Sequence, residues 1–312
     1  MIGSTPMLTD SQTMRRYKGF PSLKEKQKGP SGEAVTHRQA AREEQRQAVP
    51  ADFTKPGPRI SLLPLLHVHG KLPALHGLVG LDENGTPLTF DFSRRQSWHL
   101  LVDGPSGSGK SNVLRTCAAA MALSTKQSQL QYIALDPGGR DMVFLEACPH
   151  MLTDLVSDWL FTEEILQWLI RETSHRQRYR IVNPHLFLWI DDLHLLYRVL
   201  SRAARQRLVS LWEKGPEFGI HIAVSMNSRI TEFKDIFPSL ASSVHISLMN
   251  RQPAPAVSAQ GFRSVLHLEG NQKSFEPVLF FAREMNIAAD LLRTGFRLID
   301  GTLLMEGGAD AD

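Results

Sequence analysis

A glycine-rich segment, residues 104–111, sets the kind of fold that this chain can adopt. It reads Gly-Pro-Ser-Gly-Ser-Gly-Lys-Ser, a full match to the GxxxxGK[ST] pattern. The apolar stretch 98–102 precedes it, and residues 112–123, rich in Ala, Leu and Met, follow it. The order strand, loop and helix predicts a cradle in which backbone N–H groups and the helix dipole face a phosphate. The alternative is a glycine-rich turn with Lys110 merely solvated.

The predicted cradle gives its residues separate roles. The Lys110 ammonium is expected to reach the terminal phosphates, and the Ser111 hydroxyl is expected to ligate Mg²⁺. The residues predicted to bind the nucleotide are Gly104, Pro105, Ser106, Gly107, Ser108, Gly109, Lys110, Ser111 and Asn112.

A second motif, residues 185–192, reads His-Leu-Phe-Leu-Trp-Ile-Asp-Asp. Five apolar residues in a row suit a strand that is buried on both faces of a parallel sheet, and the acids follow where such a strand emerges. We predict Asp191 as the Mg²⁺ partner. Asp192 lies where many P-loop ATPases carry a water-orienting glutamate and is one methylene shorter. The alternative for the pair is a solvated strand end or a helix N-cap before residues 193–200.

Composition predicts an α/β protein of the cytoplasm, because 42% of the residues are hydrophobic and 21% are charged. Cys117 and Cys148 have no metal-ligand spacing and are expected to be small buried hydrophobes. No apolar run approaches the length of about 20 residues that a membrane span needs. Membrane attachment is therefore expected only through a partner.

Basic residues concentrate at the N-terminus although the formal net charge is only +3. Residues 1–59 are predicted as a basic, disordered arm in which residues 33–47 could form a short helix. The arm could hold phosphates or an acidic protein face, or it could be a solvated linker.

The rest of the chain predicts strands that alternate with helices. Asn84-Gly85 joins two strand-like stretches, which predicts a small β hairpin within residues 60–96. Later strands are expected at 130–136, 185–190, 219–225 and 244–248, with helices at 159–178 and 203–212 between them, and a hairpin of 265–268 with 278–282. This order predicts an α/β fold, a doubly wound, three-layer and mainly parallel sheet. We expect the ATPase core at 97–282 and a C-terminal extension at 283–312.

Several blocks in this order resemble the FtsK/SpoIIIE motor ATPases. They are 98–123, 135–139 (Leu-Asp-Pro-Gly-Gly), 148–155 (Cys-Pro-His-Met-Leu-Thr-Asp-Leu), 186–192 and 219–227. The N-terminal hairpin is most similar to the ATPase modules of the EccC/EssC proteins of type VII secretion. The resemblance implies a RecA-like P-loop NTPase that uses ATP and Mg²⁺, works in a homo- or hetero-oligomeric ring, and pulls double-stranded DNA or a secreted protein through it.

The resemblance also assigns catalytic roles. Asp192 stands at the water-orienting position, and Asn227, or with less support Ser225, stands where a γ-phosphate sensor is expected. Arg176 is assigned as the arginine that one subunit supplies to its neighbour's nucleotide. The alternative for Arg176 is a solvated residue that complements the helix dipole. His150 and His194 are expected to be packing residues.

Two functions stay open at this stage. The first is an ATP-hydrolysing motor that translocates DNA or a secreted protein. The second is a nucleotide-dependent docking or regulatory module that hydrolyses ATP slowly. The intact residues 110, 111 and 191 suit both, whereas the altered residues at 192 and 227 favour the second. A membrane-embedded partner is compatible with either.

Overall fold

A computed structural model describes residues 60–82, 84–139, 141–227, 236–237, 240, 242–248, 264–268, 271–294, 296–299 and 302–305. The predicted arm at 1–59, its possible helix and the last seven residues lie outside the described part. The elements are α3 (Leu62–His69), β1 (His76–Leu81), β2 (Pro87–Asp91), η2 (Arg95–Ser97), β3 (His99–Asp103), α4 (Lys110–Ser124), β4 (Leu130–Leu135), η3 (Val143–Ala147), α5 (Trp159–Tyr179), β5 (His185–Ile190), α6 (Leu193–Val199), α7 (Arg202–Lys214), η4 (Gly215–Phe218), β6 (Ile220–Met226), β7 (Ser243–Leu248), β8 (Ser264–Leu268), β9 (Asn271–Pro277), α9 (Ala282–Thr294), β10 (Phe296–Ile299) and β11 (Thr302–Met305).

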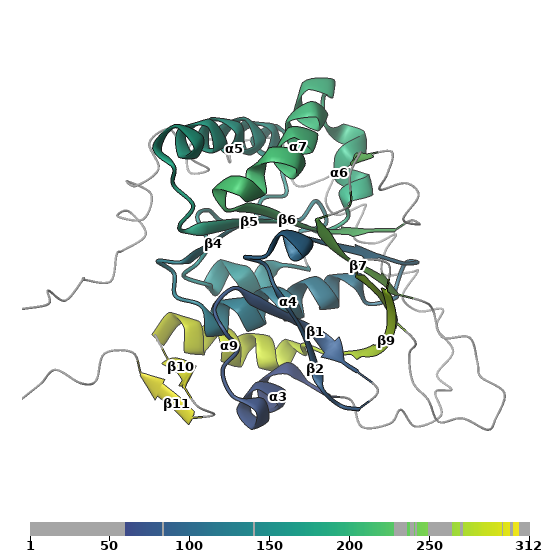
Figure 1. The fold of residues 1–312 in the computed structure, drawn as a ribbon, viewed down its shortest axis with the longest axis vertical. Helices are drawn as coiled ribbons and strands as arrows, with labels where there is room; N and C mark the ends of the chain where they lie inside the picture. Colours follow the sequence, from purple (N-terminus) through teal and green to yellow (C-terminus); the bar gives the residue numbers. More distant parts are fainter. Residues whose placement is uncertain are drawn as a thin grey trace, which may run out of the picture.

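A nine-stranded sheet in the order β2-β1-β9-β8-β7-β3-β6-β5-β4 forms the centre of the molecule. Strands β7, β3, β6, β5 and β4 run parallel, and β8, β9, β1 and β2 continue the sheet in antiparallel pairs. Helices α5, α6 and α7 cover one face, and α4 and α9 cover the other (Figure 1). The three-layer, mainly parallel α/β prediction is confirmed.

The parallel strands are apolar on both faces because helices cover both. In β3, Leu100 and Val102 pack into the core that includes α4, whereas Leu101 between them packs into the core beneath α5 and α7. In β5, Phe187 and Trp189 face the first core. A continuous apolar run is thus the sequence expression of a strand inside a three-layer domain.

The N-terminal hairpin is confirmed and joins the central sheet. β1 pairs with β2 and also with β9. On the same strand Gly77 faces α4, where a Cβ would lie 2.3 Å from Cys117 Sγ. Beyond residue 282, Ala288 and Leu292 of α9 belong to the same hydrophobic core as α4. The expected boundaries near residues 96 and 282 therefore cross one continuous sheet and core.

The second strand of the late hairpin was predicted in the wrong place. β8 pairs with β9, which covers 271–277, and 278–282 is not a strand of the sheet. The carbonyl of Val278 accepts hydrogen bonds from the side chains of Asn112 and Thr116 on α4, at 3.0 and 3.1 Å. This segment is apolar because it packs against α4. In the sequence, such an apolar run cannot be told apart from a buried strand.

Cys117 and Cys148 are both buried, as predicted. Within the described residues, no helix combines the length and the apolar character that crossing a membrane requires.

Candidate nucleotide-binding site

The glycine-rich loop leaves the carboxyl end of β3 and leads into α4. Gly104 has φ 148°, and a Cβ there would meet the Leu248 carbonyl oxygen at 2.4 Å, so this position requires glycine. Gly107 and Gly109 have φ 79° and 99°, and a Cβ at either would meet no atom within 4 Å. The loop backbone is thus uncovered at these glycines before α4, and a phosphate cradle needs such accessible backbone.

The side chains of the loop fit the same ligand. Ser108 Oγ is buried and has no hydrogen-bond partner within the described part of the chain. A buried hydroxyl without a partner is costly, and a phosphate oxygen would satisfy it. The loop therefore fits a nucleotide triphosphate on a structural observation that is independent of the motif.

Lys110 opens α4 and is only 7% exposed. Its Nζ donates a hydrogen bond to the Pro105 carbonyl at 2.9 Å, which folds the side chain across the loop. Burial lowers the pKa of Lys110, and the carboxylates of Asp191, Asp192 and Asp103 oppose that shift. A partly desolvated ammonium at a helix N-terminus is suited to an anionic ligand.

Asp191 lies directly after β5, as predicted, and serine hydroxyls donate to both of its oxygens. Ser111 Oγ donates to Oδ2 at 2.9 Å, and Ser225 Oγ, from the end of β6, donates to Oδ1 at 2.5 Å. Burial raises the pKa of Asp191, the two hydroxyls lower it, and the charges of Asp141 and Asp136 raise it further. The structure thus places Ser111 and Asp191 together, as a Mg²⁺ site requires.

Asp192 lies beside Asp191 but its carboxylate is used differently. Its Oδ1 accepts from the backbone N–H of Leu195 at 3.2 Å and caps α6, with φ 55° at the cap. Asn227 Nδ2 donates to its Oδ2 at 3.3 Å. The backbone N–H of Asp192 donates to Ser225 Oγ at 2.9 Å. The N-cap alternative from the sequence thus describes this carboxylate, and the less favoured Ser225 contacts both acids.

Asn112 does not offer its side chain to the loop. Its Nδ2 donates to the Val278 carbonyl, and its Oδ1 accepts from the Phe280 backbone N–H at 2.9 Å. Both ends of the amide hold the 278–280 segment against α4. Any nucleotide contact of Asn112 would therefore come from its backbone, and the sequence carries no local signal for a side-chain partner 166 residues away.

Arg176 lies at the end of the sheet opposite the loop. Its side chain is 1% exposed, its Nε donates to Glu172 Oε1 at 2.8 Å, and its Nη1 lies within 3.2 Å of three backbone carbonyl oxygens, those of Val182, Pro184 and Phe218. Pro184 and Phe218 precede β5 and β6, whereas the loop follows β3. A buried guanidinium bound to its own chain cannot reach a neighbour's nucleotide, so we withdraw the predicted trans role.

The two histidines of the sequence analysis have no direct link to the loop. His150 is buried, with Nε2 2.8 Å from the Thr125 carbonyl oxygen and Nδ1 3.2 Å from Cys148 Sγ. His194 is an exposed residue of α6. Within the described residues no cluster of three His, Cys, Asp or Glu side chains could hold a metal ion.

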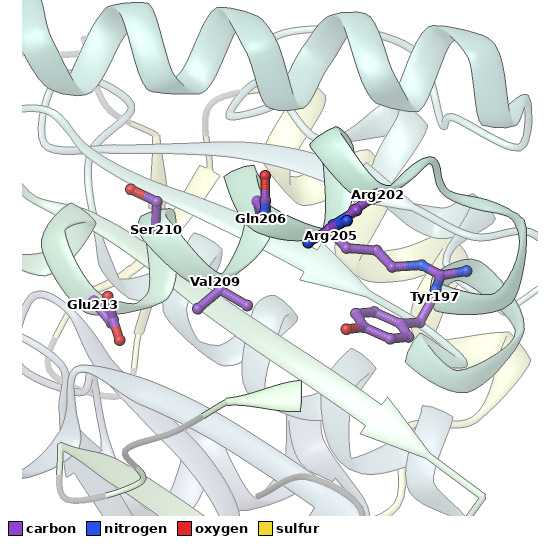
Figure 2. Close-up of a pocket in the computed structure, with 7 residues that line it drawn as sticks. All are labelled: Tyr197, Arg202, Arg205, Gln206, Val209, Ser210 and Glu213. Carbon is purple, nitrogen blue, oxygen red and sulfur yellow. The ribbon is translucent and has the colours of Figure 1, made fainter. Parts of the chain in front are cut away.

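A groove of about 530 Å³ lies on α6 and α7, away from the loop. Figure 2 shows the Arg205 side chain beside the Tyr197 ring, and its guanidinium carbon lies 4.8 Å from the ring centre. The lining residues are Tyr197, Arg202, Arg205, Gln206, Val209, Ser210 and Glu213. None of these residues belongs to the predicted nucleotide site, so the groove does not mark it.

Comparison with known sequences finds relatives that are named DNA translocases. The DNA translocase FtsK of Tropheryma whipplei is 27% identical over 164 residues, which are 50% of this chain and 22% of that protein. The DNA translocase SftA of Bacillus subtilis is 23% identical over 172 residues, which are 48% of this chain and 18% of that protein. The chain therefore corresponds to only a part of each.

Solved structures share the fold. The EssC ATPases 2 and 3 from Geobacillus thermodenitrificans superpose with a TM-score of 0.60 at 15% identity, over 79% of this chain and 54% of that one. The cytoplasmic domain of the Thermomonospora curvata type VII secretion ATPase EccC gives 0.59 at 17% identity, over 77% and 35%. Residues 68–260 match the sequence profile of the FtsK/SpoIIIE family, and the chain belongs to that family.

Proposed function

We propose that this chain is a motor ATPase module that binds Mg-ATP at the loop and uses its hydrolysis to move an extended polymer. One observation carries the proposal: the Ser111 hydroxyl, from the loop helix, and the Ser225 hydroxyl, from β6, meet on the two oxygens of Asp191. Three elements distant in sequence thus converge beside Lys110. Such convergence at the carboxyl ends of parallel strands is where α/β proteins bind ligands.

The residues divide the work as follows. The loop N–H groups and the Lys110 ammonium hold the phosphates and oppose the charge that develops on them. The Ser111 hydroxyl and the Asp191 carboxylate would hold Mg²⁺, which would supply positive charge to offset that of the phosphates. Ser225 orients Asp191 from the opposite side. The site thus has the positioning and electrostatic groups that phosphoryl transfer requires.

A second function, a slowly hydrolysing docking module, is favoured by the geometry of Asp192. Its carboxylate caps α6 and bonds Asn227, so its reach toward an attacking water competes with two existing contacts. A module that binds ATP without rapid turnover would keep the loop intact and allow this acid to take a structural role.

The polymer is proposed from the family. The two sequence relatives are named DNA translocases, and the EccC structure is named as a type VII secretion ATPase. We propose double-stranded DNA, with a secreted protein as the alternative substrate. We further propose that the chain acts in a cytoplasmic ring and meets any membrane through a partner.

The decisive experiment measures ATP turnover per chain with and without linear double-stranded DNA, over a hundredfold range of protein concentration. The motor proposal predicts turnover that rises with concentration and with DNA. A slow rate that neither DNA nor dilution changes would support the docking module instead. Lys110→Ala serves as the blank, because it should retain the fold and lose the rate.

Asp191 and Asp192 can be separated in the same assay. Asp191→Asn should weaken Mg²⁺-dependent binding, whereas Asp192→Asn should leave binding intact and lower turnover. Asp192→Glu tests whether reach limits the rate. If both asparagine variants lose the same affinity, the proposed division of roles is wrong.

A further inference from the structure

The turn that follows β4 is fixed by one buried carboxylate. Asp136 is 1% exposed, and its two oxygens accept four backbone N–H groups, those of Gly138, Gly139, Asp141 and Met142, at 2.7 to 3.1 Å. A carboxylate saturated in this way has little capacity left for a ligand. Its evident task is to hold the turn in one conformation.

The turn begins at the same edge of the sheet as the predicted nucleotide site. β4 and β5 pair in register up to Leu135 and Ile190, and the Asp191 N–H donates to the Leu135 carbonyl at 3.0 Å. Asp136 and Asp191 therefore leave adjacent strands at the same edge.

Arg115 ties Asp141 to the loop helix. Its Nη1 donates to the Asp141 carbonyl at 3.1 Å and to Asp141 Oδ1 at 3.2 Å. Arg115 follows Ser111 by four residues on α4, so both side chains point from the same face of the helix. One face of α4 thus contacts Asp191 through Ser111 and Asp141 through Arg115.

The remaining oxygen of Asp141 is the distinctive feature. The Asp141 side chain is 49% exposed, whereas the Arg115 side chain is 18% exposed. Ser111 and Ser225 occupy the two oxygens of Asp191, and α6 and Asn227 occupy those of Asp192. Among these three acids, Asp141 Oδ2 alone has no hydrogen bond within the described residues.

We propose that Asp141, held by Arg115, is a positioning residue of the Mg-ATP site, where its Oδ2 accepts a hydrogen bond from a water in the Mg²⁺ shell. The inference rests on the proposed nucleotide-binding function. It adds a third acid and its anchoring arginine to that site. Outer carboxylates of this kind orient metal-bound water without touching the metal.

The test measures Mg²⁺ dependence rather than turnover. Thermal stabilisation by a non-hydrolysable ATP analogue is followed as Mg²⁺ is titrated, and Mn²⁺ affinity in the same complex is read by electron paramagnetic resonance. Asp141→Asn should raise the Mg²⁺ midpoint and weaken Mn²⁺ binding by about tenfold. Asp154→Asn, which removes an exposed carboxylate from the following segment, is the matched control and should behave as the parent.

Arg115 variants test the anchoring role. Arg115→Gln should shift the midpoint in the same direction, and the Arg115→Gln/Asp141→Asn double variant should be no worse than Asp141→Asn, because Arg115 acts through Asp141. A purely structural pair would lower the unfolding midpoint in urea and leave the Mg²⁺ midpoint unchanged, which would overturn the inference. If the parent shows no stabilisation by the Mg²⁺ complex of the analogue, the proposed function itself fails.

Discussion

The two ends of the parallel sheet both carry buried polar groups, but the groups are satisfied in different ways. At the carboxyl ends of the strands, within the described residues, the buried Ser108 Oγ has no hydrogen-bond partner and the partly exposed Asp141 keeps an open oxygen. At the amino ends, Arg176 donates to its own backbone, and His185, His221 and His99 bond one another or nearby main chain. Open bonding capacity therefore distinguishes a binding end from a structural end, although both look polar in the sequence.

Two of the histidines at the amino ends, His221 and His99, are neutral, as their hydrogen bonds require. The Trp98 carbonyl accepts from His221 Nδ1, which leaves His221 Nε2 to accept from His185 Nδ1. His99 Nδ1 accepts from the Ile222 N–H, and its Nε2 donates to the Trp212 carbonyl. His221 and His99 thus each use one ring nitrogen as donor and the other as acceptor. The hydrogen bonds at this end of the sheet stabilise the fold rather than bind a ligand.

The largest expected effect on ligand binding is at the binding end. Lys110→Ala removes the loop's ammonium while leaving its backbone shape, so Mg-ATP affinity should fall by at least about 100-fold, or about 2.8 kcal/mol. Thermal stabilisation by Mg-ATP measures it, with Lys71→Ala, an exposed lysine, as control. A Lys110→Ala protein that Mg-ATP stabilises as strongly as the parent would contradict the assignment of the loop.

Arg176 provides the opposite case at the structural end. Arg176→Met leaves Glu172 and three carbonyl oxygens without their donor, so the free energy of unfolding should fall by about 3–5 kcal/mol. Arg178→Met, at an exposed position in the same helix turn, should change it by about 0.5 kcal/mol or less. Urea unfolding measures both.

The same pair distinguishes structure from function. If Arg176→Met is as stable as the parent but loses ATP turnover that depends on protein concentration, the trans role must be restored. Arg176→Lys should be intermediate in stability, because an ammonium cannot reproduce the planar guanidinium fork.

The same contrast between the two ends of the sheet explains which features the sequence alone could predict. The loop, the strand before Asp191 and the helix-strand alternation depend on local pattern, because glycine spacing and apolar runs encode backbone conformation directly. The partner of a side chain is not local. Asn112 turns to Val278 and Phe280, and Arg176 turns to Phe218, because folding brings those carbonyl and N–H groups close. Position in a motif does not determine the partners of these two side chains for this reason.

Acid should destabilise the structural end first. Burial lowers the pKa of His185 to about 4, with Arg176 adding to the shift and Asp91 opposing it, and burial lowers the pKa of His99 to about 3. Because the folded pKa lies below the unfolded value near 6.5, the unfolded chain binds more protons as pH falls from about 6.5 toward 4. For His185, the free energy of unfolding should fall by about 3 kcal/mol over that pH range.

Urea unfolding at pH 7 and pH 5 checks this expectation. The parent should lose stability between the two conditions, and His185→Gln should lose less. His194→Gln, at an exposed position, should keep the parent's pH dependence. A parent with equal stability at both pH values would show that these histidines are protonated in the fold.

The smallest expected effect separates the two candidate sensor residues. Ser225 is 1% exposed, donates to Asp191 Oδ1 and accepts from the Asp192 N–H, whereas Asn227 is exposed and has one 3.3 Å bond to Asp192. Ser225→Ala should therefore lower turnover by about tenfold, or about 1.4 kcal/mol, which is the scale of one hydrogen bond to a charged group. Ser225→Thr keeps the hydroxyl and should retain most of the rate. Asn227→Ala should change turnover by about twofold or less, since an exposed neutral bond contributes little. Steady-state ATPase assays on the three variants give the order directly, and a larger loss in Asn227→Ala than in Ser225→Ala would return the sensor role to Asn227.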